Sequence, residues 1–173
     1  EVLPQSLFAI PEAAEVHGTF VENALAKARH AAQLTGLAAL ADDSGLCVDA
    51  LDGAPGVYSA RYSATPDIAA TDARNNEKLL AALTGQSNRR AHFVCVLALV
   101  RHAADPQPLL SEGEWRGEIL TAPRGSDGFG YDPLFLVPGL GLTAAELAHE
   151  RKNAISHRGK ALAALIARLR AEA

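Results

Sequence analysis

The sequence predicts a single α/β domain over residues 1–173, in which helices alternate with the strands of a mixed sheet. Stretches with helical apolar spacing and short apolar runs follow one another from residue 19 onward, as α/β folds require. Residues 91–120 read as strands joined without a helix, which favours a mixed sheet over a wholly parallel one. A length of 173 residues, 49% of them hydrophobic and 21% charged, suits one folded domain.

The first predicted helix carries both a start and a stop signal. Thr19 and Glu22 form a capping box, in which each residue satisfies a free N–H group at the helix start. Gly36 is expected to end this helix, because glycine readily adopts the left-handed conformation found at helix C-termini. A second helix is predicted over residues 69–83.

Two further helices are predicted toward the end of the chain. Thr143 and Glu146 form another capping box and are expected to open the third helix. The fourth begins near Ser156. Its apolar residues fall on one face and are Leu162, Leu165, Ile166 and Leu169.

Strands are expected at residues 37–41, 91–100, 115–120 and 134–137. Residues 91–100 are apolar nearly throughout, which is typical of a central strand that is covered on both faces. The first strand is expected to end at Asp42-Asp43-Ser44-Gly45, where the apolar pattern breaks.

Composition narrows the partners and the location that we expect. A net charge of −4 argues against a nucleic-acid partner, and no apolar run approaches the twenty or so residues of a membrane span. The start of the chain lacks the features of a signal peptide. Cys47 and Cys95, the two cysteines, lie in apolar stretches, so we expect buried free thiols and a cytoplasmic location.

Adjacent carboxylates mark the first of three segments that are suited to chemistry. Asp42 and Asp43 would be costly at a strand end unless they are solvated, paired or bound to a cation. Magnesium is held by one or two carboxylates and keeps its waters, and one carboxylate could accept a proton from water. The alternative is an ordinary solvated turn.

The second segment is a glycine-rich loop, and the third is basic. Phe129 lies between glycines and could stack on a base whose edge Asp132 contacts, although the aromatic side chains of such a loop can equally fill a core. Residues 151–160 contain four Lys or Arg residues around Ser156, a plausible helix N-cap, so phosphates could bind there. The alternative for this segment is a solvated basic face.

Five motifs occur in order from about Glu15 to the last helix, with compatible spacing. They are Thr19-Phe20-x-Glu22-Asn23-Ala24 with Lys27, Ala41-Asp42-Asp43-Ser44-Gly45-Leu46, Gly53-Ala54-Pro55-Gly56-Val57-Tyr58-Ser59-Ala60-Arg61-Tyr62, Gly128-Phe129-Gly130-Tyr131-Asp132-Pro133 and Ser156-His157-Arg158-Gly159. Any one motif is a weak signal, but together they resemble the inosine/xanthosine triphosphate pyrophosphatase family.

This resemblance implies an architecture and an activity. The architecture is a two-lobed fold with a long mixed sheet flanked by helices, an active-site cleft between the lobes, and a homodimer. The activity is Mg²⁺-dependent hydrolysis of inosine, deoxyinosine and xanthosine triphosphates to the monophosphate and pyrophosphate, which cleanses the nucleotide pool.

The resemblance also implies roles for individual residues. Asp43 matches the general base and a metal-linked carboxylate, and Glu15 falls at the position of a second metal-linked acid. Lys27 and Ser44 match phosphate-contacting positions, and Arg61 matches a further substrate-binding position. The residues that match the surroundings of the base are Phe129, Gly130, Tyr131, Asp132, Lys152, His157 and Arg158.

One family feature has no counterpart in the sequence. The family opens with a strand and a Thr/Ser-x-Asn-x-x-Lys loop that cradles phosphates, and no such motif occurs near Glu1. The domain is therefore expected to lack this first strand and loop. Two alternative functions stay open: a non-catalytic nucleotide-binding module, and a pyrophosphatase that acts on pyrimidine triphosphates.

Overall fold

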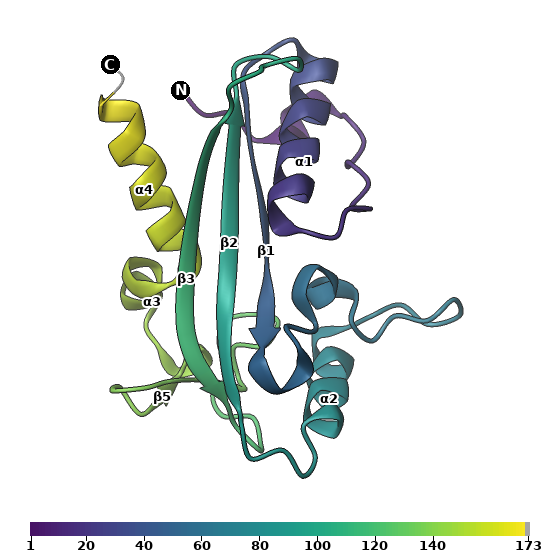
Figure 1. Cartoon of the computed structure of the whole chain (residues 1–173), viewed down its shortest axis with the longest axis vertical. Helices are drawn as coiled ribbons and strands as arrows, with labels where there is room; N and C mark the ends of the chain where they lie inside the picture. Colours follow the sequence, from purple (N-terminus) through teal and green to yellow (C-terminus); the bar gives the residue numbers. More distant parts are fainter. Residues whose placement is uncertain (172–173) are drawn as a thin grey trace.

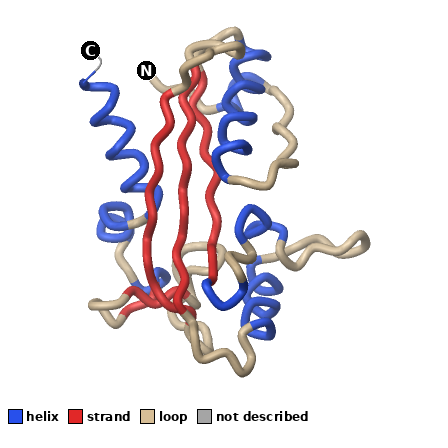
Figure 2. Tube along the Cα trace, in the orientation of Figure 1, coloured by secondary structure: helices blue, strands red, loops and turns tan. Residues whose placement is uncertain are grey.

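Three long strands form the centre of the molecule in the computed structural model, which describes residues 1–171 (Figure 1). Helices lie on both sides of these strands, and shorter elements gather around their lower ends (Figure 2). The start of the chain lies near the upper end of the strands in this view. This arrangement confirms the predicted α/β class.

The sheet has five strands in the order β1-β2-β3-β4-β5. They are β1 (Ala39–Val48), β2 (Arg90–Val100), β3 (Leu109–Ile119), β4 (Phe135–Val137) and β5 (Leu142–Thr143). All four strand pairings within the described residues are antiparallel. The sequence-based prediction of a mixed sheet is therefore wrong. The reason is that every strand pairs with its successor in the chain, and even the long β1–β2 connection returns beside the strand it leaves.

Strand β1 does not end at the acidic residues, which corrects the prediction for residues 37–41. It continues through them in unbroken register, with Asp43 opposite Val96 and Ser44 opposite Cys95. The backbone pairing of β2 holds the segment extended although its side chains are polar. Because successive side chains of a strand point to opposite faces, Asp42 and Asp43 face opposite sides of the sheet.

Two helices cover the two faces of the long strands. Helix α1 (Phe20–Thr35) packs on β1 and β2, and α4 (His157–Ala171) packs on β2 and β3. Strand β2 packs against both helices. Val94 and Val96 cluster with the alanines of α1, and Cys95 clusters with Ala161 and Leu165 of α4. No helix within residues 1–171 has both the length and the apolar character that crossing a membrane requires.

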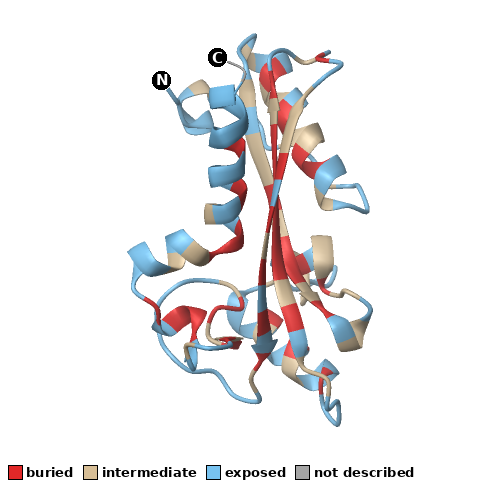
Figure 3. Ribbon diagram, turned by 60° about the vertical axis from the view of Figure 1, so that its left-hand side comes forward, coloured by how far each residue is buried: buried red, intermediate tan, exposed pale blue. Residues whose placement is uncertain are grey.

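A second lobe forms around the lower ends of the strands. Its core includes the fully buried Leu46, Leu79 and Phe135. Figure 3 shows buried positions gathered around the lower ends of the strands. The helical elements outside α1 and α4 are α2 (Asp72–Ala82), α3 (His149–Ile155) and the 3-10 turns η1 (Gln5–Phe8), η2 (Asp49–Leu51), η3 (Gly56–Arg61) and η4 (Ala144–Glu146). The two lobes share the long sheet, as the two-lobed architecture predicts.

The predicted capping signals are present, although one opens a shorter element than expected. Thr19 accepts the Glu22 N–H at 3.3 Å, and Gly36 ends α1 with a φ of 71°. The box formed by Thr143 and Glu146 opens the three-residue turn η4 rather than a long helix. The capping box satisfies the first turn only, and apolar spacing that would extend the helix does not follow it.

Candidate active site

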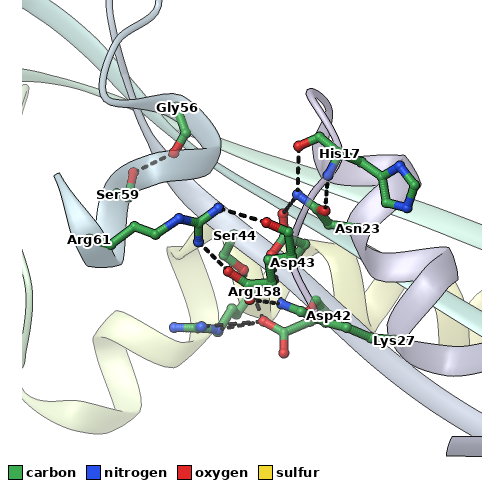
Figure 4. A network of polar contacts seen from close by, with 11 residues as sticks. His17, Asn23, Lys27, Asp42, Asp43, Ser44, Gly56, Ser59, Arg61 and Arg158 are labelled. Carbon is green, nitrogen blue, oxygen red and sulfur yellow. Dashed lines mark hydrogen bonds and ion pairs between the residues drawn. The ribbon is translucent and has the colours of Figure 1, made fainter. Parts of the chain in front are cut away.

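Asp43 lies at the centre of a polar network between β1 and α1 (Figure 4). Lys27 donates to Asp43 Oδ1 at 2.7 Å, and Asn23 donates to Asp43 Oδ2 at 3.2 Å. Asn23 and Lys27 are four residues apart on α1, so they present their side chains on one helical face. Asp43 is only 6% exposed, so little water reaches its carboxylate. Both of its oxygens accept hydrogen bonds from side chains of α1.

Glu15 joins this network from the segment that precedes α1. Lys27 Nζ lies 2.5 Å from Glu15 Oε1, and Arg61 Nη1 donates to Glu15 Oε2 at 2.5 Å. Arg61 is the last residue of η3, which brings this guanidinium to the acids from the other lobe. The structure thus gathers Glu15, Lys27, Asp43 and Arg61 into one cluster, in which Lys27 bridges the two carboxylates.

The two carboxylates of the cluster differ in acidity. Burial raises the pKa of Asp43, and the hydrogen bonds from Lys27 and Asn23 only partly offset it. Burial also pushes the pKa of Glu15 upward, but two cations, Lys27 and Arg61, outweigh it and the pKa is lowered. Asp43 is therefore the better proton acceptor of the pair, and Glu15 is the more firmly ionised acid.

Asp42 and Ser44 lie on the other face of β1, toward α4. Ser44 donates to Asp42 Oδ2 at 2.9 Å, and Arg158 donates to the same oxygen from Nη2 at 3.2 Å. The hydroxyl of Ser44 is thus engaged by Asp42 on the face opposite Asp43. Its predicted contact with phosphate stays a prediction.

The aromatic loop and the basic helix start meet around Phe129, whose side chain is exposed. The Phe129 N–H donates to Asp132 Oδ2 at 2.8 Å, and Lys152 forms a short ion pair with the same oxygen. Lys152 Nζ lies 5.0 Å from the centre of the Phe129 ring, and the Arg158 guanidinium lies 5.4 Å from it. Arg158 therefore connects Asp42 on β1 with the aromatic ring of the loop.

Three residues that the resemblance places around the base, Tyr131, Asp132 and His157, are buried. The Tyr131 hydroxyl donates to the Ser59 carbonyl at 2.8 Å, and burial raises the pKa of Tyr131. The His157 ring stacks on Phe93 at 4.8 Å, and burial together with nearby positive charges lowers the pKa of His157 to about 3. The Tyr131 hydroxyl has a partner in the core, and His157 is held as a neutral imidazole.

A cavity of about 840 Å³ adjoins the acid cluster. Glu15, Lys27, Asp42 and Arg158 are among the residues that line it, so residues from both faces of β1 contribute to one opening. A cavity in the range of typical ligand sites that is lined by acids and bases suits a charged, metal-associated ligand.

Several polar residues that contact the predicted site residues were given no role by the sequence. Asn23 donates to Asp43. From α2, Asn75 accepts from the Ser63 N–H, and Asp72 and Asn76 bond to the backbone of Gly130. Asn23 could have been found, because it shares the polar face of the first helix with Lys27. The residues of α2 act on loops that are distant in sequence, and helical spacing alone does not indicate those partners.

Asp43 and Glu15 are the residues that could hold a metal ion. Within residues 1–171 no group of three or more His, Cys, Asp or Glu side chains is arranged to bind a metal. A pair of carboxylates nevertheless suits Mg²⁺, which is commonly held by one or two carboxylates together with substrate phosphates and water. The donor set therefore fits a magnesium ion that is shared with a phosphorylated substrate.

Comparison with known proteins identifies close relatives. The chain is 62% identical over 170 residues to a dITP/XTP pyrophosphatase from Ralstonia nicotianae, a match covering 98% of this chain and 85% of the relative. It is 65% identical over 169 residues to a dITP/XTP pyrophosphatase from Aromatoleum aromaticum, covering 98% and 84% of the two chains.

A structural comparison and a family model give the same result as these relatives. A solved HAM1 protein from Coxiella burnetii superimposes with a TM-score of 0.92 at 54% identity, covering 99% of this chain and 86% of the other. The model of the Ham1 family matches residues 1–168. These matches confirm the resemblance stated from the five motifs, and the chain belongs to the Ham1 family.

Proposed function

We propose that the chain hydrolyses the non-canonical purine nucleoside triphosphates ITP, dITP and XTP to the monophosphate and pyrophosphate. The observation that carries this proposal is the position of Arg158, which contacts Asp42 beside the acid cluster and also lies over Phe129. One substrate could therefore reach the acids with its phosphates and the aromatic loop with its base. The names of the relatives support the same substrate class.

Asp43 is the proposed general base. Its raised pKa makes it a better proton acceptor than an exposed aspartate, and Lys27 and Asn23 fix the direction of its oxygens. A water oxygen forms a bond to the α-phosphorus while Asp43 accepts its proton. The bond between the α-phosphorus and the bridging oxygen breaks, and pyrophosphate leaves.

Lys27 and Arg61 are the proposed phosphate contacts. Both are cations at the acid cluster, and each is held in place by Glu15. Positive charge there stabilises the negative charge that develops on the leaving pyrophosphate, which is the main demand of phosphoryl transfer.

Mg²⁺ is the proposed cofactor, with Asp43 and Glu15 as the residues that would hold it. When bound, the ion would neutralise phosphate charge and favour ionisation of a bound water. Glu15 suits this role because its carboxylate lies in the same cluster as Asp43, where Lys27 and Arg61 lower its pKa. Lys27 forms ion pairs with both carboxylates, and these ion pairs hold the two acids near each other.

Phe129 is the proposed stacking surface for the purine. Its side chain is 61% exposed, so a flat ligand can reach the ring. Lys152 and Arg158 lie over the ring and carry only hydrogen-bond donors, which suit the oxygen at position six of hypoxanthine and xanthine. Adenine carries an amino group at this position, and two donors would then face each other.

We further propose a cytoplasmic homodimer. The two cysteines are free thiols, which suits a reducing compartment, and the dimer is inferred from the family resemblance. Light scattering at micromolar concentration tests the assembly. A mass of one chain would contradict the dimer without affecting the proposed chemistry.

Product analysis with ITP tests the proposed reaction. In the presence of Mg²⁺ we expect inosine monophosphate and pyrophosphate in equal amounts, with no inosine diphosphate. Release of inorganic phosphate with the diphosphate would contradict attack at the α-phosphorus. Binding of ITP without turnover would favour a non-catalytic nucleotide-binding module. Faster turnover of pyrimidine triphosphates than of ITP would favour a pyrophosphatase that acts on pyrimidine nucleotides.

A further inference from the structure

Helix α2 holds both backbone groups of Gly130. The Gly130 N–H donates to Asp72 Oδ2 at 2.7 Å, and the Gly130 carbonyl accepts from Asn76 Nδ2 at 2.9 Å. Asp72 and Asn76 are four residues apart and share one face of the helix. One rigid element therefore fixes the single glycine that separates the two aromatic residues of the loop.

Gly130 needs such support because its backbone is unusually free. It has a φ of 61°, in the left-handed region that glycine enters readily. Its neighbours point in opposite directions, since Tyr131 is buried on the Ser59 carbonyl while Phe129 is 61% exposed. The Phe129 ring is not packed in the core, so its direction depends on the backbone of the loop and on the two cations, Lys152 and Arg158, that lie over it.

The hydrogen bonding of Asn76 is consistent with a purpose other than stability. Its Nδ2 donates to Gly130, but its buried Oδ1 has no hydrogen-bond partner among residues 1–171. Leaving a buried polar atom unpaired lowers the stability of the fold. A leucine of similar size would remove this unpaired oxygen, and it would also remove the bond to the Gly130 carbonyl.

The same helix also supports the other half of the site. Asn75 is buried and accepts the Ser63 N–H at 2.8 Å, while its Nδ2 donates to the carbonyls of Ser59 and Ala60. These contacts hold η3, whose last residue is Arg61. Successive residues of α2 therefore anchor the base side and the phosphate side of the site separately.

We infer that Asp72 and Asn76 are positioning residues for base recognition, which act through Gly130 on the direction of the Phe129 ring. This inference rests on the proposed function, because it assigns them to the base side of that reaction. Asn75 belongs to the phosphate side. The two sets predict different kinetic effects although they lie on one helix.

Two variants, Asn76→Leu and Asp72→Ala, test the inference. Each should raise the KM for ITP about tenfold, the size expected when a stacked base is poorly held, with kcat changed by less than about threefold. The affinity for inosine monophosphate, measured by calorimetry, should fall by a similar factor. The affinity for inorganic pyrophosphate, which has no base, should not change.

Two control variants separate positioning from general damage. Asp72→Asn keeps an oxygen that can accept the Gly130 N–H, so it should retain the KM of the unaltered chain. Glu77→Leu places the same apolar residue on the exposed part of α2 and should change neither affinity. Asn76→Leu and Asp72→Ala should both still be folded at the assay temperature, and a change confined to KM and to the affinity for inosine monophosphate is a result that a purely structural role would not give.

The outcomes distinguish this inference from the proposed function. If the unaltered chain hydrolyses ITP but Asn76→Leu and Asp72→Ala keep its KM and its affinity for inosine monophosphate, the positioning role is wrong. Equal losses of affinity for inosine monophosphate and pyrophosphate would also overturn it. If the unaltered chain neither binds inosine monophosphate nor hydrolyses ITP, the proposed function fails, and the base-positioning role fails with it.

Discussion

At the scale of single residues, the chemistry depends on how the environment of each acid sets its pKa. Asp43 and Glu15 share Lys27, yet the pKa of Asp43 is raised and that of Glu15 is lowered. The difference follows from the deeper burial of Asp43 and from the second cation, Arg61, beside Glu15. Two carboxylates in one cluster can therefore take different tasks.

Replacement of Asp43 by asparagine tests the role of the base. The amide keeps the size of the side chain but cannot accept a proton at neutral pH, so turnover of ITP should fall at least about a hundredfold. Burial of the charged carboxylate costs stability, which is why the pKa of Asp43 is raised, so the neutral amide of Asp43→Asn should not lower the melting temperature at neutral pH. Near-normal turnover in this folded variant would contradict the assignment.

Glu15→Gln tests the second metal-linked acid. The variant keeps the size of the side chain and loses the charge that would hold Mg²⁺, so activity should fall and added Mg²⁺ should partly restore it. The measurement is a Mg²⁺ titration of ITP turnover for both proteins. If the half-saturating Mg²⁺ concentration does not move, Glu15 does not bind the metal.

His157 gives a prediction about stability and pH. Its pKa is lowered to about 3 in the folded protein, so the fold favours the neutral ring. The stability that this group contributes is complete above its unfolded pKa of about 6.5. It is lost as the pH falls toward 3, at roughly 1.4 kcal/mol per pH unit.

The variant His157→Phe should remove this dependence while keeping the stacking on Phe93. Urea unfolding of both proteins between pH 7 and pH 4.5 gives the comparison. We expect the stability of the unaltered chain relative to the variant to decrease as the pH is lowered. Parallel profiles over this range would show that His157 is not held neutral by the fold.

At the scale of elements, the close approach of α3 and α4 sets the position of Arg158. A Cβ atom at Gly159 would lie 1.7 Å from the Asn153 carbonyl oxygen, which no side chain can accept without a shift of the backbone. Gly113 of β3 has the same function on the other side, because a Cβ there would lie 2.1 Å from the His157 carbonyl oxygen. Glycines thus bring the start of α4 against both its neighbours.

Gly159→Ala should therefore displace Arg158 and destabilise the fold. We expect a loss of about 1–3 kcal/mol, the usual cost of overpacking, and a smaller preference for ITP over ATP. Thermal unfolding and the ratio of kcat/KM values measure the two effects. Gly18→Ala is the matched control, because a Cβ there meets nothing within 4 Å.

The sequence predicted the elements whose signals are local. Thr19 and Gly36 mark the ends of α1 because capping depends on side chains within one turn. The end of the first strand was predicted wrongly at Asp42, because the pairing with β2 that carries β1 onward is a long-range interaction. The antiparallel sheet was missed for the same reason, since strand order does not follow from apolar spacing.

At the scale of the whole molecule, the site exists because distant segments converge on β1. Glu15, Lys27 and Asp43 were predicted together and are found in contact, through the family resemblance rather than through spacing alone. The structure adds the connection that the sequence lacked, namely Arg158 between Asp42 and Phe129. It also places Tyr131 and His157 in the core, where burial raises the pKa of Tyr131 and lowers the pKa of His157.

The ratio of kcat/KM for ITP to that for ATP tests the central claim most directly, because it depends on the acids and the base site together. The unaltered chain should hydrolyse ITP far faster than ATP, since the proposed base site sets the donors of Lys152 and Arg158 against the amino group of adenine. Arg158→Ala should narrow the gap. Equal hydrolysis of ITP and ATP by the unaltered chain would contradict this account of the site, even if Asp43 proved to be the base.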